Sequence, residues 1–475
     1  MTPRPLSRRH LLRTGLLTVP AAGLLTACGS NGSSTGTDPD GNAAVQVSDD
    51  ADNPFGVDAA ADLDVVIFDG GYGSEYADFH QQLYSAKFPE ATVDGSAIQE
   101  LTQTLQPRFV SGDVPDVIDN SGANRLEMTA LIAENQLASL QPLLDAPSID
   151  DPDTPVRDLL IPGVIEEGTF GSDVYALNYV ATVYGVWYSR SLFEEKGWEY
   201  PRTWDEMLDL CREARSEGIY GWTYGGTNAA DYLGRVIMHL AAKNGGVEAL
   251  ARIDNLEPEA WRQDSVLAAL EAVYRLNAED LMLPGSDGLE HTQAQTEWVL
   301  GEALFYASGS WIENEMAGIT PDGFDMVVAP VPNLTDDDQL DFSAIQVSAG
   351  EQFIVPAHAD NVPGALEYLR IMLSTEGAQK FSELTGAPTV VRGALDGASD
   401  GSTALASINE AMENASETRL YYQYANWYPD LREVSGPQLG NLLTGRVTPE
   451  EFADAMQEAA DRVAADDSIE KFTRE

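Results

Sequence analysis

The chain has 475 residues, enough for two large units that each bury a core of their own. Hydrophobic residues make up 43% of it and charged residues 22%, as in ordinary globular proteins. Acidic side chains number 77 against 27 basic ones, which gives a formal net charge of −50. Such a surface repels nucleic acid and offers no basic patch to anionic lipid, so both are excluded as partners.

The first 27 residues have the pattern of an export signal. A twin arginine at positions 8 and 9 precedes a largely apolar run over residues 16–25, which is too short to span a membrane. The run ends in the string LTAC, which is typical of a bacterial lipobox whose cysteine receives a lipid. We therefore predict a twin-arginine lipoprotein signal peptide over residues 1–27 and lipidation at Cys28. The protein would then be anchored on the extracellular face of the cell membrane.

Residues 28–53 are rich in Gly, Ser, Thr, Asp and Ala and hold almost no large apolar side chain. A stretch of this composition cannot bury enough surface to fold, so we predict a flexible acidic tether. Cys211 is the only other cysteine, which leaves the mature chain without an internal disulfide. It lies on the apolar stripe of a helix predicted to begin at a Thr203–Glu206 capping box, and should be buried there.

Strands and helices alternate through the rest of the chain. A β-branched run at residues 63–68 leads into the turn DGGYG and then a helical stretch from about 74 to 87. A second short strand at 116–119 leads into the turn NSGAN, and the last clear helix begins at a capping box on Thr448. This rhythm predicts an α/β fold, in which ligands bind outside the carboxyl ends of the strands.

Enzyme signatures are mostly absent. The string GYGSEY at 71–76 lacks the third glycine of a dinucleotide loop, and GASDG at 397–401 resembles a nucleophile elbow that no histidine follows. The mature chain has four histidines, none spaced as a metal pair. We predict no enzymatic activity, no cofactor and no metal. A glycosidase stays open, because it needs only two carboxylates among the 77 acids.

Aromatic residues gather in short polar segments, which favours carbohydrate binding. Sugars present an apolar C–H face, which flat rings cover, and a rim of hydroxyls, which Asp, Glu, Asn or Arg side chains can pair. Trp311 and Trp427 lie beside Ser, Glu and Asn in predicted turns, as expected for a wet cleft. Trp187 and Trp204 have apolar or helical neighbours, so we predict that they belong to the core.

The lipobox, the tether, the α/β body and the string PRTWDEM at 201–207 together resemble the solute-binding lipoproteins of bacterial ABC sugar importers. The match extends through GEALFYASGSW at 301–311 and FIVP at 353–356. Longer strings, among them DVVIFDGGYG at 64–73 and IDNLEPEAW at 253–261, are similar to an actinobacterial branch associated with N-acetylglucosamine and chitobiose.

The resemblance implies a two-lobed periplasmic-binding-protein-like fold of type II, with each lobe an α/β sandwich and the ligand cleft between them. Residues 54–180 and 327–388 would form the first lobe, and residues 181–326 and 389–475 the second. The chain would cross between lobes near residues 178–182, 326–332 and 384–392.

The resemblance also implies where the sugar binds. Trp311 and Trp427 match sugar-stacking tryptophans of the family, and Tyr232 matches a neighbouring aromatic contact. Five residues match the strand-end loops of the first lobe: Asp69, Gly70, Tyr72, Asn120 and Ser121. Four more are candidates because polar groups there adjoin glycines or aromatic rings: Trp222, Glu313, Asn314 and Glu351.

These observations predict a lipid-anchored monomer that binds a small carbohydrate, most similar in type to N-acetylglucosamine or chitobiose, and delivers it to ABC permease subunits. A first alternative keeps the fold and changes the ligand to another disaccharide, a maltooligosaccharide or a polyol. A second is a surface hydrolase of chitin fragments, and a third is a scaffold with no small ligand.

Overall fold

The computed structural model describes residues 36–37, 43–161, 163–393, 402–415 and 419–474. The predicted signal peptide, Cys28 and the GASDG string lie outside the described residues. No helix in the described part of the chain is long and apolar enough to cross a membrane.

One mixed sheet of nine strands runs through the molecule in the order β4-β3-β5-β12-β8-β10-β9, with β11 paired to β8 and β13 paired to β12. β3, β4 and β5 are parallel, whereas β12 is antiparallel to both β5 and β8. The strands of this sheet are β3 (Leu63–Phe68), β4 (Val93–Ile98), β5 (Val117–Asp119), β8 (Leu177–Ser189), β9 (Tyr220–Trp222), β10 (Ala303–Ser308), β11 (Met326–Ala329), β12 (Ile345–Ile354) and β13 (Arg419–Leu420).

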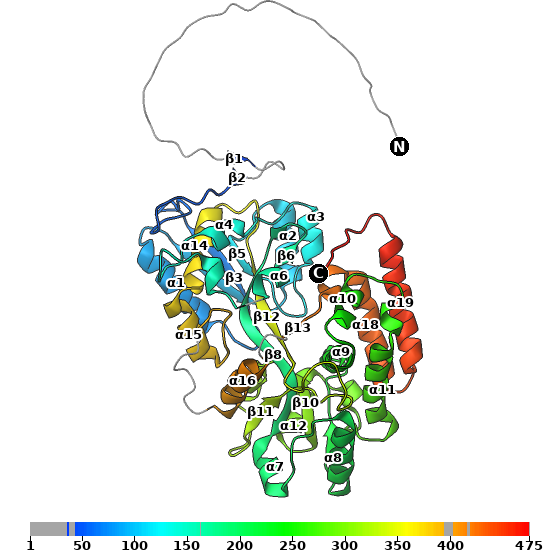
Figure 1. The fold of residues 1–475 in the computed structure, drawn as a ribbon. Coiled ribbons are helices and arrows are strands. Elements are labelled where there is room, and N and C mark those ends of the chain that lie inside the picture. Colours follow the sequence, from blue (N-terminus) through cyan, green and yellow to red (C-terminus); the bar gives the residue numbers. More distant parts are fainter. Residues whose placement is uncertain (1–35, 38–42, 162, 394–401, 416–418, 475) are drawn as a thin grey trace, which may run out of the picture.

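The long strands β8 and β12 join two halves of the molecule (Figure 1). The first residues of β8 pair with the last residues of β12, and β12 pairs there with β5. The other end of β8 pairs with β10 and β11. We call the half around β3, β4 and β5 the first lobe. Its helices are α1 (Glu75–Lys87), α2 (Leu101–Ser111), α3 (Met128–Ala133), α4 (Gln141–Asp145), α5 (Val156–Leu159), α6 (Val164–Glu167), α14 (Val362–Met372) and α15 (Thr375–Thr385).

We call the half around β9, β10 and β11 the second lobe. Its α-helices are α7 (Arg190–Lys196), α8 (Trp204–Ser216), α9 (Asp231–Gly245), α10 (Glu248–Asp254), α11 (Asp264–Ala278), α12 (His291–Val299), α13 (Ile312–Met316), α16 (Thr403–Asn414), α17 (Tyr424–Trp427), α18 (Pro429–Leu443) and α19 (Pro449–Ala465). Two 3₁₀ turns, η1 (Ala260–Arg262) and η2 (Ser286–Gly288), lie among them.

The second crossing between the lobes differs from the predicted one. β11 pairs with the carboxyl half of β8, and the segment after it bonds to the second lobe, where Lys243 Nζ donates to the carbonyl of Phe342 at 2.7 Å. The chain therefore returns to the first lobe along β12 rather than at residues 326–332. The predicted third crossing contains Val390, whose N–H donates to the Tyr179 carbonyl at 2.9 Å.

The helix signals in the sequence have physical counterparts. Thr203 and Thr448 both form the predicted capping boxes, with Glu206 and Glu451 as the reciprocal partners at the starts of α8 and α19. Trp187 and Trp204 are core residues as predicted, and Cys211 is fully buried. Burial raises the pKa of the Cys211 thiol, which makes it a poor nucleophile.

Part of the predicted tether has regular structure. Within it, β1 (Gly36–Thr37) pairs with β2 (Ala43–Ala44). Outside the tether, another two-stranded sheet pairs β6 (Thr169–Phe170) with β7 (Asp173–Val174). Asn53 then bonds through its side chain to both backbone groups of Val57, which is buried. Phe55 and Val57 belong to the buried cluster of the first lobe, so the chain joins the core at these residues.

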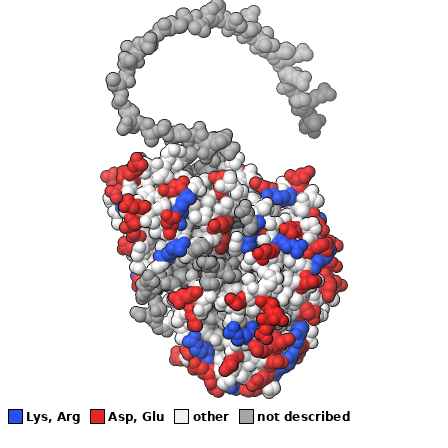
Figure 2. Space-filling model, viewed as in Figure 1, with Lys and Arg blue, Asp and Glu red and all other residues white. Residues whose placement is uncertain are grey.

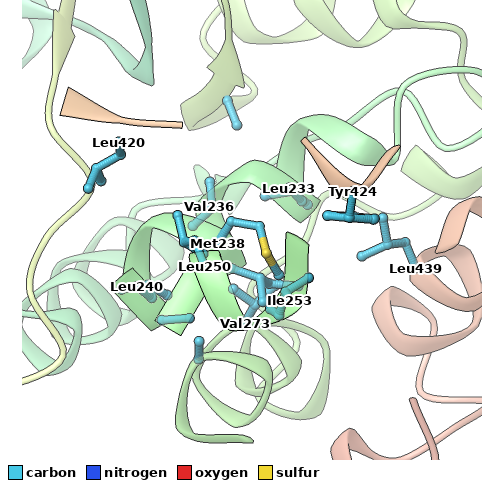
Figure 3. Close-up of a cluster of buried hydrophobic side chains, with 14 of the residues drawn as sticks. Leu233, Val236, Met238, Leu240, Leu250, Ile253, Val273, Leu420, Tyr424 and Leu439 are labelled. Carbon is cyan, nitrogen blue, oxygen red and sulfur yellow. The ribbon is translucent and has the colours of Figure 1, made fainter. Parts of the chain in front are cut away.

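Two clusters of buried apolar side chains hold the fold together. One packs α1, α14 and α15 against β3 and β8 and continues into the second lobe at α12, α13 and α16. The other includes α2 and α3 of the first lobe and most of the helices of the second lobe, from α8 to α11 and α17 to α19. In the second cluster, α9 side chains such as Leu233 and Val236 meet Leu250 of α10 and Val273 of α11, with Tyr424 beside them (Figure 3). Outside these cores, acidic side chains outnumber basic ones over the face drawn in Figure 2.

Candidate functional site

Two strand-end loops of the first lobe form one wall of the candidate site. β3 and β5 are parallel neighbours, so the loops at residues 69–73 and 120–122 leave the same edge of the sheet. A Cβ atom at Gly70 or Gly122 would stand only 2.2 or 2.3 Å from ring carbons of Phe68. Only glycine lets both loops lie this close to the Phe68 ring.

A pair of buried carboxylic acids lies where these loops meet β12. Asp119 accepts hydrogen bonds from the Ser121 hydroxyl at 2.5 Å and the Tyr76 hydroxyl at 3.2 Å, and it is hydrogen-bonded to Glu351. Glu351 has a left-handed backbone with φ of 50°, which is rare for a residue other than glycine. We call Asp119 and Glu351 the acid pair.

Burial sets the protonation of the acid pair. It raises the pKa of Asp119 to about 6. Burial together with the neighbouring charge of Asp119 raises the pKa of Glu351 well above its ordinary value. Two adjacent carboxyl groups cannot both ionise cheaply, so the pair holds a proton near neutral pH. One of the two groups can then donate a hydrogen bond while the other accepts.

Tyr72 connects the acid pair to the second lobe. Its ring packs edge-on against Phe381 at a centroid distance of 5.7 Å, and its hydroxyl lies beside those of Thr182 and Ser310. Burial raises the pKa of the Tyr72 hydroxyl, and the charge of Glu351 raises it further. The hydroxyl is therefore a neutral group that can donate and accept.

Aromatic rings form the opposite wall. The ring centroid of Trp311 lies 5.3 Å from that of Tyr184 and 5.8 Å from that of Tyr232. The guanidinium of Arg235 stacks on Tyr184 at 3.8 Å and lies 6.0 Å from the ring of Tyr422. We call the four rings, Tyr184, Tyr232, Trp311 and Tyr422, the aromatic cluster.

The two walls approach each other at Gly71. A Cβ atom added there would lie 3.4 Å from Cβ of Trp311 and 3.4 Å from the Glu315 side chain on α13. Polar loops of the first lobe therefore face aromatic rings of the second lobe across a narrow gap. In the described part of the chain, no group of three or more His, Cys, Asp and Glu side chains is placed to hold a metal ion.

Residues 73–379 match the family of bacterial extracellular solute-binding proteins. The chain belongs to this family. The diacetylchitobiose binding protein NgcE of Streptomyces coelicolor is 36% identical over 467 residues, which cover 98% of each chain. The multiple sugar-binding protein of Streptococcus mutans is 22% identical over 320 residues, covering 64% of this chain and 69% of the relative. These matches confirm the resemblance found in the sequence.

Solved structures of solute-binding proteins share the fold. A chitin oligosaccharide binding protein superposes with a TM-score of 0.69 at 17% identity, covering 85% of this chain and 99% of that one. Apo RafE of Streptococcus pneumoniae superposes with a TM-score of 0.67, also at 17% identity, covering 86% and 99%. The predicted α/β fold of two lobes is thereby confirmed.

Within this solute-binding protein, the structure brings five of the predicted site residues to the facing walls: Tyr72, Ser121, Tyr232, Trp311 and Glu351. Asp69 and Gly70 lie on the same loop as Tyr72, and the Asp69 N–H donates to the carbonyl of Ile98 at 3.0 Å. Asn120 is fully buried instead, and its amide bonds both backbone groups of Leu126. It shapes the loop and has no surface for a ligand.

The structure places Trp222 in the core, which corrects the prediction. Its side chain is fully buried on β9. The centroid of its ring lies 6.1 Å from that of Trp204 and 5.4 Å from that of Phe305. The neighbouring glycines that suggested a binding loop instead leave room for close packing, because a Cβ at Gly221 would strike Cys211 Sγ at 2.5 Å.

Three further candidates have partners away from the aromatic cluster. Glu313 accepts from the Ser402 hydroxyl at 2.7 and 2.9 Å, and the Asn314 amide donates to the carbonyl of Thr385. Both residues therefore fix α13 against its neighbours. Trp427 is only 8% exposed, and its ring packs 5.5 Å from that of Phe472.

Four residues of the walls were missed in the sequence: Asp119, Tyr184, Arg235 and Tyr422. One signal was available, because Tyr232, Arg235 and His239 recur at the spacing of one helical face on α9. Tyr184 and Tyr422 lie in polar-aromatic segments of the sequence, at 184–188 and 421–428, but that pattern does not single them out from their neighbours. Strand pairing between distant segments brings them and Asp119 to the walls, and local sequence does not encode it.

Proposed function

We propose that this protein is the carbohydrate-binding subunit of an ABC importer and that its ligand is N-acetylglucosamine or diacetylchitobiose. The observation that carries the proposal is the pair of facing walls in a chain 36% identical, over its whole length, to a diacetylchitobiose binding protein. The aromatic cluster supplies rings for the C–H faces of a sugar. The first-lobe wall supplies hydroxyl and carboxyl groups for its rim.

The protonation of the acid pair suits a neutral, hydroxyl-rich ligand. A sugar hydroxyl both donates and accepts, and Glu351, the partly exposed member of the pair, can take either role as the proton moves between it and the fully buried Asp119. A negatively charged ligand would meet repulsion from Asp119 and Glu351 in a site of low dielectric. We therefore expect uncharged sugars to bind in preference to uronic acids.

Closure of the lobes around the sugar would produce the form that a permease recognises. Contacts that join the lobes in this structure support such closure. Arg125 donates to the Asn426 side chain at 2.8 Å, and Glu127 forms an ion pair with Arg432 on α18. The Phe170 ring of the first lobe packs 5.9 Å from Phe472 near the C-terminus. We expect β8 and β12 to act as the hinge.

We propose that the protein does not hydrolyse its ligand. The two carboxyl groups of the candidate site, Asp119 and Glu351, are hydrogen-bonded to each other. Glycosidases hold their carboxyl groups roughly 5–9.5 Å apart, on either side of the scissile bond. Prolonged incubation with diacetylchitobiose should release no monosaccharide, and release that Glu351→Gln abolishes would contradict this proposal.

Thermal unfolding with a panel of sugars tests the binding function. The protein without its predicted signal peptide would be heated with N-acetylglucosamine, diacetylchitobiose, cellobiose, maltose, trehalose and sorbitol. A ligand at 100 times its Kd adds about 2.7 kcal/mol of stability, or about 3 °C in a chain of this size. A shift with N-acetylated sugars alone supports the proposal. A shift with another sugar alone would keep carbohydrate binding and replace the ligand, and no shift at all would contradict carbohydrate binding.

We propose that the protein is held at the extracellular face of the membrane by a lipid on Cys28, as a monomer, after export through the twin-arginine route. The supporting observation is the LTAC string after a short apolar run with two arginines before it. Cys28→Ser should move the protein from the membrane fraction to the medium. Replacement of both arginines by lysine should prevent export.

A further inference from the structure

The last described residues of the chain are partly buried although they form no helix or strand. Residues 470–474 follow α19 as an irregular segment, which we call the tail. Phe472 is 9% exposed and the side chain of Arg474 is 8% exposed, whereas the residues on either side of Phe472 are exposed. This alternation is that of an extended chain with one face buried. The tail therefore rests on the second lobe through Phe472 and Arg474.

One buried carboxylate joins the tail to the loop that carries Tyr422. Oδ1 of Asp254, at the end of α10, accepts from the N–H groups of Gln423 and Tyr424 at 2.7 and 2.8 Å. Its other oxygen, Oδ2, accepts from Arg474 Nη1 at 2.9 Å. The side chain of Asp254 is fully buried, so loss of Arg474 would leave a buried charge uncompensated. The loop and the tail therefore depend on the same carboxylate.

Arg474 also bonds to the loop directly. Its Nη1 donates to the carbonyl of Tyr421 at 2.7 Å, and its guanidinium carbon lies 3.7 Å from the centre of the Tyr421 ring. Its backbone N–H and carbonyl bond to the side chain of Asn255 at 2.7 and 2.9 Å. Burial raises the pKa of Asp254 to about 6 and the charge of Arg474 opposes this shift, so the guanidinium favours the ionised carboxylate.

The loop places Tyr422 in the aromatic cluster. It begins directly after β13, which pairs with β12. The ring of Tyr422 stacks on that of Tyr424 at a centroid distance of 5.5 Å, and Tyr424 packs edge-on against Trp261 at 5.1 Å. The position of the Tyr422 ring therefore follows from the backbone that the Asp254 carboxylate holds.

The tail also meets the first lobe. The centroid of the Phe472 ring lies 5.9 Å from that of Phe170 on β6 and 5.5 Å from that of Trp427. The Phe472 N–H donates to the Tyr428 hydroxyl at 3.1 Å, and these four residues belong to one buried cluster. Asn426, which bonds to the first lobe, belongs to the same loop as Tyr428. A change in the tail would therefore alter both a wall of the site and the contacts that join the lobes.

We infer that Asp254 and Arg474 are positioning residues for ligand binding. They hold the loop of residues 421–428 so that Tyr422 completes the aromatic cluster and the lobes meet at Phe472. If the loop left this position in part of the molecules, the apparent Kd would rise by the inverse of the fraction that keeps it. The inference rests on the proposed function, because it needs the aromatic cluster to contact the sugar.

Calorimetric titration with diacetylchitobiose tests the inference through a double-mutant cycle. The Kd would be measured for the wild-type chain, Arg474→Ala, Tyr422→Ala and the variant that carries both changes. We expect Arg474→Ala to raise the Kd about 10-fold, through a loop that is in place in roughly a tenth of the molecules. In the Tyr422→Ala background the same change should raise it about 3-fold or less, because the ring that Arg474 positions is absent. Arg474→Lys keeps a charged donor and should recover part of the affinity.

Arg370→Ala is the matched control. Arg370 is 2% exposed and, like Arg474, it bonds to a buried carboxylate and to a backbone carbonyl, those of Glu367 and Pro147. It lies on α14 of the first lobe, and Glu367 would keep its ion pair with Lys87. We expect this control to lower the melting temperature, as Arg474→Ala does, without a change in Kd. A loss of affinity through general destabilisation would appear in both variants.

The outcomes separate this inference from the proposed function. If the wild-type chain binds the sugar and Arg474→Ala binds it equally well, or loses the same factor with and without Tyr422, the inference is wrong while the proposed function stands. If the wild-type chain binds no sugar, both fail.

Hydrogen–deuterium exchange of the wild-type protein decides the matter if Arg474→Ala does not fold. A tail that assists binding must itself be stabilised by the ligand, because coupling between two sites is reciprocal. Slower exchange at residues 470–474 on adding diacetylchitobiose supports the inference. Unchanged exchange there, in a protein that binds the sugar, overturns it.

Discussion

The two walls of the candidate site are built from different chemistry. On the first lobe, loops at the carboxyl ends of β3 and β5 present Tyr72, Ser121 and the acid pair, with no cation near Asp119 or Glu351 in their described surroundings. On the second lobe, the aromatic cluster surrounds the single guanidinium of Arg235. One wall is suited to pair hydroxyl groups and the other to cover apolar ring faces.

This difference explains why neither lobe would bind a sugar well by itself. Rings without polar partners would bind any flat apolar ligand, and carboxyl groups exposed to water would bind hydroxyls no better than water does. When the lobes close, each wall removes water from the other and both sets of contacts gain strength. Specificity therefore depends on the two walls acting together.

The largest effect should come from a tryptophan that belongs to neither wall. Trp222→Ala removes a fully buried ring from between Trp204 and Phe305, so it should lower the free energy of unfolding by about 3–5 kcal/mol. Chemical denaturation measures this loss. The Kd of the folded molecules for the sugar should not change. A loss of sugar affinity at unchanged stability would show that Trp222 belongs to the binding site.

Trp311→Ala should weaken sugar binding strongly and change the stability of the protein less than Trp222→Ala does. Loss of roughly 100 Å² of ring contact with a sugar face costs about 2.5 kcal/mol, which is a rise of roughly 70-fold in Kd. Because Trp311 is only partly buried, the melting temperature without ligand should change less than in Trp222→Ala. Titration calorimetry and thermal unfolding of both variants give the comparison, and an unchanged Kd in Trp311→Ala would remove this ring from the site.

Glu351→Gln should change how stability depends on pH. The folded-state pKa of Asp119 is raised to about 6 and that of Glu351 is raised further, so the folded protein binds more protons than the unfolded chain above about pH 4. The stabilisation is present at low pH and is lost as pH rises through these values. The free energy of unfolding should therefore fall more steeply from pH 4 to 7 in the wild-type protein than in Glu351→Gln, and melting temperatures measured across this range show the difference.

Asp254 and Lys243 also titrate near this pH range, but they do not affect the comparison of the wild-type protein with Glu351→Gln. Burial raises the pKa of Asp254 to about 6 and lowers that of Lys243 to about 7, but both lie in the second lobe and are unchanged by the substitution. The difference between the two proteins therefore isolates the acid pair. Parallel pH profiles would mean that Asp119 and Glu351 do not share a proton.

The smallest effect should come from the ion pair that joins the lobes. Glu127→Gln breaks the pair with Arg432, and both side chains are exposed enough that the interaction contributes only about 0.2–1 kcal/mol. We expect the Kd for the sugar to rise roughly 1.5- to 5-fold through a smaller closed population. Glu279→Gln is the control, because its pair with Arg212 lies within the second lobe. An equal effect of both substitutions would argue against a role in closure.

Local signals in the sequence predicted much of the fold. Capping boxes gave the starts of α8 and α19, and a β-branched run gave the bounds of β3, because hydrogen bonds and burial there involve near neighbours. The second crossing was misplaced because the short apolar run of β11 does not itself show which lobe it belongs to. Its place follows from pairing with β8, more than a hundred residues earlier in the chain, and β12 rather than β11 reaches β5.

The site was less predictable because similar local settings have different surroundings in the fold. Trp311 and Trp427 both lie beside polar residues, yet Trp311 joins Tyr184 and Tyr232 whereas Trp427 is covered by Phe472 from the end of the chain. The acid pair arises only where β5 and β12 align Asp119 with Phe353, two residues from Glu351. Contacts of this kind depend on tertiary structure.

Hydrogen–deuterium exchange with and without diacetylchitobiose tests most directly whether both walls hold the sugar. We predict slower exchange, on adding the sugar, in the loop at residues 69–73 on the first lobe and in residues 309–316 on the second. The peptide that contains Trp222 should not change. Protection of both walls together would support closure around the ligand, whereas protection of one wall alone, or of neither, would contradict it.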